Sequence, residues 1–169
     1  GPLKRGIEIK HLNFAYPGTS VPVLNDLNVF IPAGKKTAFV GSTGSGKTTI
    51  VKLLARLYDP DQGDVLFDGL NLRTLSLESL YSQLAYLSQE VPIFTGTVEQ
   101  NVAFGLSDYS ETELHQALQR SSCDFVNQPG MHGLQTKVGE VGKKLSGGQK
   151  QRIALSRIFI RNPSVIILD

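Results

Sequence analysis

The feature that most constrains this chain is a glycine-rich run of eight residues, Gly41-Ser42-Thr43-Gly44-Ser45-Gly46-Lys47-Thr48. The run fits the pattern G-x-x-x-x-G-K-[ST]. It follows a β-rich stretch at 36–40 and precedes apolar residues at helical spacing from Ile50 to Leu57. Strand, loop and helix in this order are the context in which such a loop binds phosphate. The motif therefore predicts an α/β chain built around a phosphate-binding loop.

The residue types in this loop suit phosphate chemistry. Glycines allow close approach and positive φ, so successive backbone N–H groups can surround phosphate oxygens at a helix N-terminus. We expect Lys47 to reach the β and γ phosphates and Thr48 to offer a hydroxyl to Mg²⁺. Asp169, which ends an apolar run, would hold the same metal. The alternative is a turn that only caps a helix. In that case the flanking strand, the flanking helix and the distant carboxylate of Asp169 would all be coincidental.

Local patterns in the first half predict several short elements. Apolar residues alternate from Ile7 to Tyr16 with one slip, which predicts a strand, and 23–31 predicts a second strand. We expect further strands at 64–67 and 84–88, with a short helix at 75–83 between them. The dipeptide Asp68-Gly69 predicts a turn after the strand at 64–67.

The second half is predicted to be mostly helical. Ser110 and Glu113 have the capping-box spacing and predict a helix after Ser110. A longer helix is expected over 148–160, before Asn162-Pro163. The final run, 165–169, reads as a strand covered on both faces of a parallel sheet.

Composition excludes several classes of protein. Hydrophobic residues make up 40% of the chain and charged residues 19%, which is typical of a globular domain. A net charge of +2 is too small to predict binding of nucleic acid or an anionic membrane by bulk attraction. The chain has neither a run of about 20 apolar residues nor a signal-peptide core. Its single cysteine, Cys123, excludes an internal disulfide and is expected in the core.

A second loop with open backbone N–H groups precedes the long helix, Leu145-Ser146-Gly147-Gly148-Gln149. Ser146 can cap the helix, and the two glycines leave room for an anion at its N-terminus. With this LSGGQ sequence, the chain from Ile7 onward resembles the nucleotide-binding domain of ABC transporters. The segments 95–101 and 138–142 are similar to those of exporter-type members.

The resemblance implies a P-loop NTPase (RecA-like) α/β core with an antiparallel β-subdomain and an ABC-type α-helical subdomain. It implies one partial nucleotide-binding domain over 1–169, with the helical subdomain at 92–160. In that family two such domains pair head to tail, and each ATP with its Mg²⁺ lies between the glycine-rich loop of one and the LSGGQ loop of the other. The expected partners are a second nucleotide-binding domain and transmembrane domains, at the cytoplasmic face of a membrane, with no nucleic acid.

The resemblance also assigns roles to single residues. Tyr16 looks like the aromatic residue that stacks on adenine, and Gln89 like the glutamine that senses Mg²⁺ and the attacking water. Catalytic roles fall on Lys47 and Gln89, and metal ligation on Thr48, Gln89 and Asp169. The residues expected to contact ATP are Tyr16, Gly41, Ser42, Thr43, Gly44, Ser45, Gly46, Lys47, Thr48, Thr49, Gln89, Ser146, Gly147, Gly148 and Gln149.

The chain departs from the family pattern after Asp169. In the family, a glutamate base follows this aspartate, and a D-loop and a switch histidine come later. We therefore expect a domain whose carboxyl-terminal part is missing and which does not hydrolyse ATP in this form. Two alternatives stay open: an ABC ATPase that moves no solute, and a nucleotide-binding module without turnover. The transported substrate has no signature in these residues.

Overall fold

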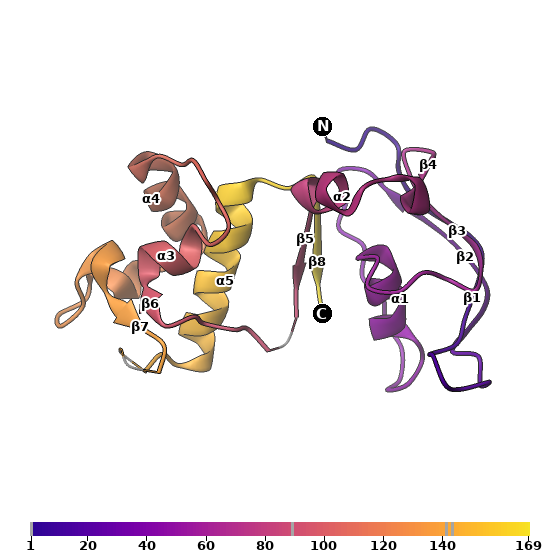
Figure 1. Ribbon diagram of the computed structural model, residues 1–169, viewed down its shortest axis with the longest axis horizontal. Coiled ribbons are helices and arrows are strands. Elements are labelled where there is room, and N and C mark those ends of the chain that lie inside the picture. Colours follow the sequence, from indigo (N-terminus) through magenta and orange to yellow (C-terminus); the bar gives the residue numbers. More distant parts are fainter. Residues whose placement is uncertain (1, 89, 141, 143) are drawn as a thin grey trace. The chain divides into compact units, whose positions relative to one another are not determined.

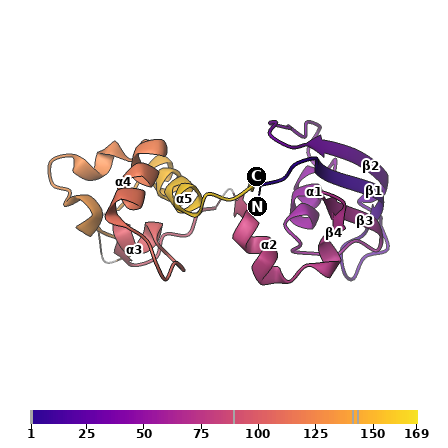
Figure 2. The same ribbon diagram turned by 90° about the horizontal axis from the view of Figure 1, so that it is seen from above.

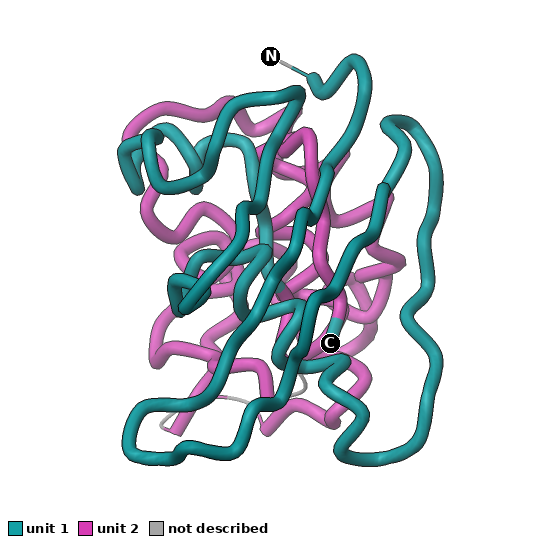
Figure 3. The backbone as a smooth tube through the Cα atoms, turned by 90° about the vertical axis from the view of Figure 1, so that its right-hand side faces the viewer, with its two compact units in different colours: residues 1–86, 169 teal, residues 87–168 magenta. Residues whose placement is uncertain are grey.

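The computed structural model of this protein describes residues 2–88, 90–140, 142 and 144–169. It divides into two compact units (Figure 3). Unit 1 comprises Gly1–Tyr86 together with Asp169, and unit 2 comprises Leu87–Leu168. Within the described ranges, every helix is too short or too polar to span a bilayer.

Unit 1 is built on a four-stranded antiparallel sheet (Figure 1). The strands lie in the order β2-β1-β3-β4. Their bounds are β1 (Gly6–Phe14), β2 (Leu24–Pro32), β3 (Gln62–Phe67) and β4 (Leu70–Asn71). β5 (Leu84–Leu87) follows, and its last residue, Leu87, is the first residue of unit 2. The antiparallel sheet implied by the resemblance is therefore present.

The slip in the apolar alternation of β1 is a β-bulge. Its pairing register shifts between Ile9 and Leu12, and His11 has a φ of 47°. Because one residue is inserted, both Ile9 and Leu12 face the core, although they are three positions apart. The bulge thus continues the buried face of β1 as far as Phe14.

The helix predicted from Ile50 to Leu57 is shorter than the pattern suggests. α1 runs from Lys47 to Leu54 and buries Ile50, Leu53 and Leu54 in unit 1. Arg56 has a φ of 51°, which is incompatible with a continuing helix. Leu57 therefore leaves the helix and is 49% exposed.

The other short elements of unit 1 follow the predicted order. The 3₁₀ helix η1 (Leu72–Thr74) leads to α2 (Leu77–Gln83), which Ser76 caps through Ser79 N at 3.1 Å. The predicted turn at Asp68-Gly69 joins β3 to β4 with φ angles of 50° and 87°. Positive φ at both residues is the conformation of a type I′ hairpin turn.

Unit 2 is mostly helical, and Figures 1 and 2 draw α4 beside α5. Its helices are α3 (Val98–Val102), α4 (Glu111–Arg120) and α5 (Gly147–Arg161), with the 3₁₀ helices η2 (Asp124–Asn127) and η3 (Gly133–Gln135). Two short strands pair with each other, β6 (Gly96–Thr97) and β7 (Lys137–Val138). The apolar faces of the three α-helices form one buried cluster, which includes Cys123 as predicted. β8 (Val165–Leu168) follows α5.

Two predictions about strands are wrong. Residues 36–40 form no strand, and Val40 is 89% exposed. The composition of this stretch favours a strand, but no described segment pairs with it, so its backbone groups gain no ladder. The run 165–168 does form a strand, yet Ile166 and Leu168 are exposed while Ile167 is buried. It is covered on one face and not on both.

Candidate functional site

The glycine-rich loop forms a tight turn that ends at the N-terminus of α1. Gly44 and Gly46 have φ angles of 84° and 90°, which favour glycine. Gly46 is also confined, because a Cβ there would lie 2.8 Å from Leu24 Cδ2. Residues 41–45 are exposed. The loop therefore presents backbone, rather than bulky side chains, at the positive end of a helix.

The ammonium group of Lys47 lies across this loop. Its Nζ donates to Gly41 O at 2.8 Å, to Ser42 O at 2.7 Å and to Ser45 Oγ at 3.4 Å. The first turn of α1 carries no acidic residue. Positive charge from the side chain and from the helix end thus gathers in one exposed turn, which suits a polyanion.

Asp169 lies beside the loop, as the motif predicts. Thr48 Oγ1 donates to Asp169 Oδ1 at 3.2 Å, across 121 positions of sequence. Tyr86 donates its hydroxyl to Asp169 Oδ2 at 3.1 Å. Burial, followed by this bond to the carboxylate, raises the pKa of Tyr86, so the hydroxyl stays protonated at neutral pH.

Thr48 and Asp169 together fit a magnesium ion. A hydroxyl and a carboxylate are the oxygen ligands that Mg²⁺ prefers, and both lie next to the turn that suits phosphate. Tyr86 was not predicted, because a tyrosine in a short strand carries no signal of its neighbours.

Tyr16 stands next to α1. Its hydroxyl lies 3.0 Å from Thr49 Oγ1, which joins two residues that were predicted separately. The ring makes edge contacts with Phe14 and Tyr58, with centroids 5.1 and 5.3 Å away. Lys52 Nζ lies 5.4 Å from the ring centroid. Tyr16 is therefore fixed beside the loop while remaining half-buried.

The LSGGQ loop in unit 2 caps α5 in the predicted manner. Ser146 Oγ accepts from Gln149 N at 3.2 Å, and Gln149 Oε1 accepts from Ser146 N at 2.9 Å. The space beside Gly147 is open. At Gly148, the atom nearest to the position that a Cβ would occupy is an Arg152 nitrogen, 3.8 Å away. The first turn of α5 thus presents exposed backbone at a helix N-terminus.

Two predicted features fall on positions outside the described residues. One is Gln89, and the other is Val141 in the exporter-like segment 138–142. The role of Gln89 and the exporter-like character of the segment 138–142 stay predictions.

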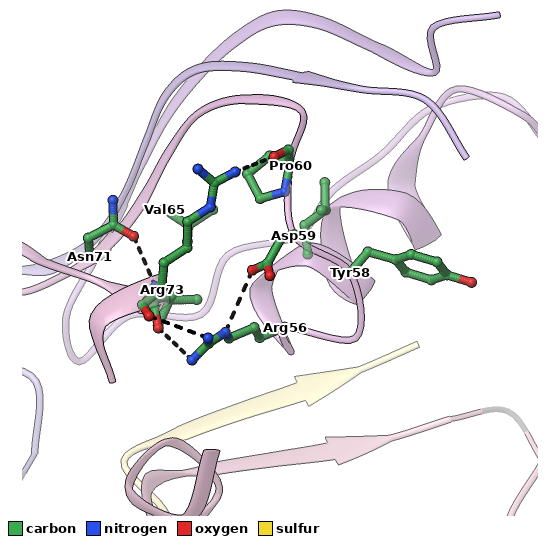
Figure 4. Close-up of a pocket in the computed structure, with 9 residues that line it drawn as sticks. Arg56, Tyr58, Asp59, Pro60, Val65, Asn71 and Arg73 are labelled. Atoms are coloured by element: carbon green, nitrogen blue, oxygen red, sulfur yellow. Dashed lines mark hydrogen bonds and ion pairs between the residues drawn. The ribbon is translucent and has the colours of Figure 1, made fainter. Parts of the chain in front are cut away.

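A small pocket in unit 1 has a structural use (Figure 4). Arg56 donates to Leu72 O at 2.8 Å and to Leu75 O at 2.6 Å, and Arg73 donates to Pro60 O. These guanidinium groups tie the connection after α1 to η1. The residues that line this pocket do not include any of the glycine-rich loop.

Comparison with known proteins gives consistent matches. The profile of the ABC transporter family matches residues 24–169. The chain is 46% identical over 168 residues to the ATP-dependent lipid A-core flippase of Yersinia pestis bv. Antiqua (strain Antiqua), covering 98% of this chain and 29% of that protein. It is 44% identical over 165 residues to the flippase of the same name from Escherichia coli (strain K12), covering 96% and 28%.

A third relative has no stated substrate. The chain is 42% identical over 167 residues to YwjA of Bacillus subtilis (strain 168), described as an uncharacterized ABC transporter ATP-binding protein, and covers 99% of this chain and 29% of that protein. The chain thus spans less than a third of the length of these relatives.

Proposed function

This chain belongs to the ABC transporter family, and we propose that it forms the ATP-binding part of the motor domain of an ABC exporter. Membership implies the P-loop NTPase fold. The observation that carries the proposal is the meeting of Thr48 with Asp169 beside the Lys47 loop. A phosphate site, a metal site and a positive helix end then lie in one exposed turn.

The residues of unit 1 have distinct roles in binding. Phosphate oxygens take over the contacts that Lys47 makes with Gly41 O and Ser42 O, while loop N–H groups surround the phosphates. Thr48 and Asp169 would hold Mg²⁺, which would supply positive charge to offset the negative charge of the phosphates. Tyr16 stacks on the adenine, and its bond to Thr49 keeps the ring beside α1.

In the whole protein we propose that ATP is bound between two copies of the domain. Ser146, Gly147, Gly148 and Gln149 of one copy contact the nucleotide held by the other, and Gln89 orients the attacking water. The exposed first turn of α5 supports this role, since it is free to meet a second chain. Binding and hydrolysis then drive export through transmembrane domains at the cytoplasmic face of a membrane.

Two other functions compete with this proposal. An ABC ATPase that moves no solute is less well supported, because two of the relatives above are described as flippases. A binding module without turnover fits the 169 residues themselves. Among these residues we assign Asp169, whose oxygens accept hydrogen bonds from Thr48 and Tyr86, to the metal and not to the attacking water. We propose that these residues alone bind ATP and release no phosphate, which a phosphate-release assay tests.

The binding proposal is tested by Lys47→Ala in the full-length protein. Charge-assisted hydrogen bonds contribute roughly 1.5–3 kcal/mol each, so the Kd of a fluorescent ATP analogue should rise by about 10- to 150-fold. Lys35→Ala is the matched control, because Lys35 is exposed and precedes the loop. Equal Kd values for parent and Lys47→Ala would overturn the assignment.

A further inference from the structure

Arg157, in the second half of α5, donates hydrogen bonds to residues much earlier in unit 2. Its Nε donates to Asn101 O at 2.6 Å, its Nη1 to Pro92 O at 2.8 Å and its Nη2 to Asn101 Oδ1 at 2.7 Å. Two of the three acceptor atoms belong to Asn101 in α3, and the third is the carbonyl oxygen of Pro92, three positions after Gln89. One side chain of the LSGGQ helix thus joins three parts of unit 2.

Asn101 in α3 binds the same early segment, and we call this set of hydrogen bonds between Arg157, Asn101 and the backbone at 92–94 the link. Its side chain is 1% exposed and uses both ends of its amide. Oδ1 accepts from Phe94 N at 2.9 Å, and Nδ2 donates to Phe94 O at 2.8 Å and to Thr97 O at 3.0 Å. The backbone at 92–94 is therefore held by Asn101 and Arg157 together.

The link depends on the directions of its hydrogen bonds rather than on attraction between opposite charges. The three acceptors of Arg157 are neutral carbonyl oxygens, and no ion pair joins Arg157 to a carboxylate within the described ranges. The Phe94 ring lies 5.1 Å from the guanidinium carbon and stacks on Phe104 at 4.3 Å. The planar guanidinium meets these acceptors with three different nitrogens, whereas an ammonium group would have to meet all three from a single nitrogen.

We propose that Arg157 and Asn101 are positioning residues that make the segment following Gln89 and the LSGGQ helix move as one body. This rests on the proposed function, which gives Gln89 a role at the attacking water and Ser146 a role at the partner's nucleotide. Pro92 is three positions from Gln89, and Arg157 lies on the helix that Ser146 caps. A shift of α5 on dimerisation is then transmitted through these bonds to the segment beside Gln89.

Arg161, one turn later on α5, provides a matched control. It also donates to a backbone carbonyl, but to that of Phe104, which lies outside the segment 92–94. Loss of an arginine from α5 can therefore be separated from loss of the link. Arg157→Lys keeps the charge and removes the fork, and Arg161→Lys makes the same change where the link is absent.

The first measurement is the distance between nitroxide labels at Glu90 and Lys150 in the full-length protein, with labelled chains diluted in unlabelled ones. Both positions are exposed and lie on either side of the link, and Cys123 is too buried to take up label. A narrow distribution is expected for the parent and for Arg161→Lys, and a broader one for Arg157→Lys. Thermal unfolding of each variant, and Arg157→Gln as a second substitution, separate this change from loss of folding.

The second measurement is steady-state ATP hydrolysis. For Arg157→Lys we expect kcat to fall about 10-fold or more, because misplacement by about 1 Å can cost up to 10²-fold. The KM for ATP should stay within about twofold, since the Lys47 loop belongs to unit 1. An unchanged kcat, or a lower kcat with the distance distribution unaltered, overturns the proposal. A parent that hydrolyses no ATP contradicts the proposed function instead, while the distances still test the link.

Discussion

Tyr16 is held by its edges and its hydroxyl, which leaves its ring half-exposed beside the loop. If the ring stacks on adenine, Tyr16→Ala should weaken ATP binding by roughly 1–3 kcal/mol, about 5- to 150-fold in Kd. Tyr16→Phe keeps the ring and loses the bond to Thr49, so its Kd should stay within about threefold of the parent. Titration with a fluorescent ATP analogue measures both. Tyr109→Ala is the control, and an Ala variant that binds as the parent does would exclude stacking.

Hydrogen bonds to Asp68 join the amino-terminal segment to the β3–β4 turn. The backbone N–H groups of Lys4, Gly6 and Arg5 donate to its carboxylate and hold the pKa of Asp68 below its ordinary value of 3.8. A group with a lowered folded-state pKa stabilises the fold above the unfolded-state pKa and loses that effect as the pH falls through the folded-state value.

Asp68→Asn should therefore lower the free energy of unfolding at pH 7, and the difference from the parent should shrink below about pH 4. Urea titrations at a series of pH values measure this. Asp108→Asn, at an exposed loop position, is the control. A difference that persists unchanged at pH 2–3 would show that the charge of Asp68 is irrelevant.

At the scale of elements, β3 approaches the β1 bulge so closely that a side chain is excluded. Gly63 has a φ of 83°, and a Cβ there would overlap the carbonyl oxygens of Lys10 and His11. Gly69 has a φ of 87° with open space around it. Gly69→Ala should cost about 1–2 kcal/mol from backbone conformation alone.

Gly63→Ala should cost about 1–3 kcal/mol more than Gly69→Ala, because overpacking is added to the same backbone strain. Urea unfolding of the two variants gives the comparison directly. Equal losses would mean that β1 moves aside, and that the bulge is not a fixed feature of the sheet.

The elements that could be predicted from sequence are those with local signals. The caps at Ser110 and Ser146 marked the starts of α4 and α5, because a capping box lies within four residues. The stretch 36–40 had the composition of a strand, but its pairing depends on partners distant in sequence. The same difference between local signals and long-range contacts applies to the candidate site. The motif predicted the meeting of Thr48 with Asp169, whereas the Tyr86 contact depends on how β5 is placed.

At the scale of the whole molecule, the proposed head-to-tail pairing makes the LSGGQ loop important only when a second chain is present. In a full-length, hydrolysis-blocked protein, Ser146→Arg adds bulk and charge at the exposed cap of α5 and should abolish ATP-induced dimers. Binding of ATP by a single chain should stay nearly intact, because unit 1 is unchanged. Sedimentation with and without ATP distinguishes the states. Ser107→Arg, at an exposed loop position, is the control, and dimers that survive Ser146→Arg would contradict head-to-tail pairing.

Cys123 gives the chain a chemical reporter that belongs to one unit only. It is the single thiol, it is 1% exposed, and it lies in the core of unit 2 between Ser121 and Ser156. A thiol reagent can reach it only when that core opens, so the modification rate under native conditions measures the opening free energy of unit 2. Unit 1 holds no thiol and does not contribute. Labelling rates with and without ATP would therefore report how strongly nucleotide, bound to unit 1 as proposed, protects the helical unit.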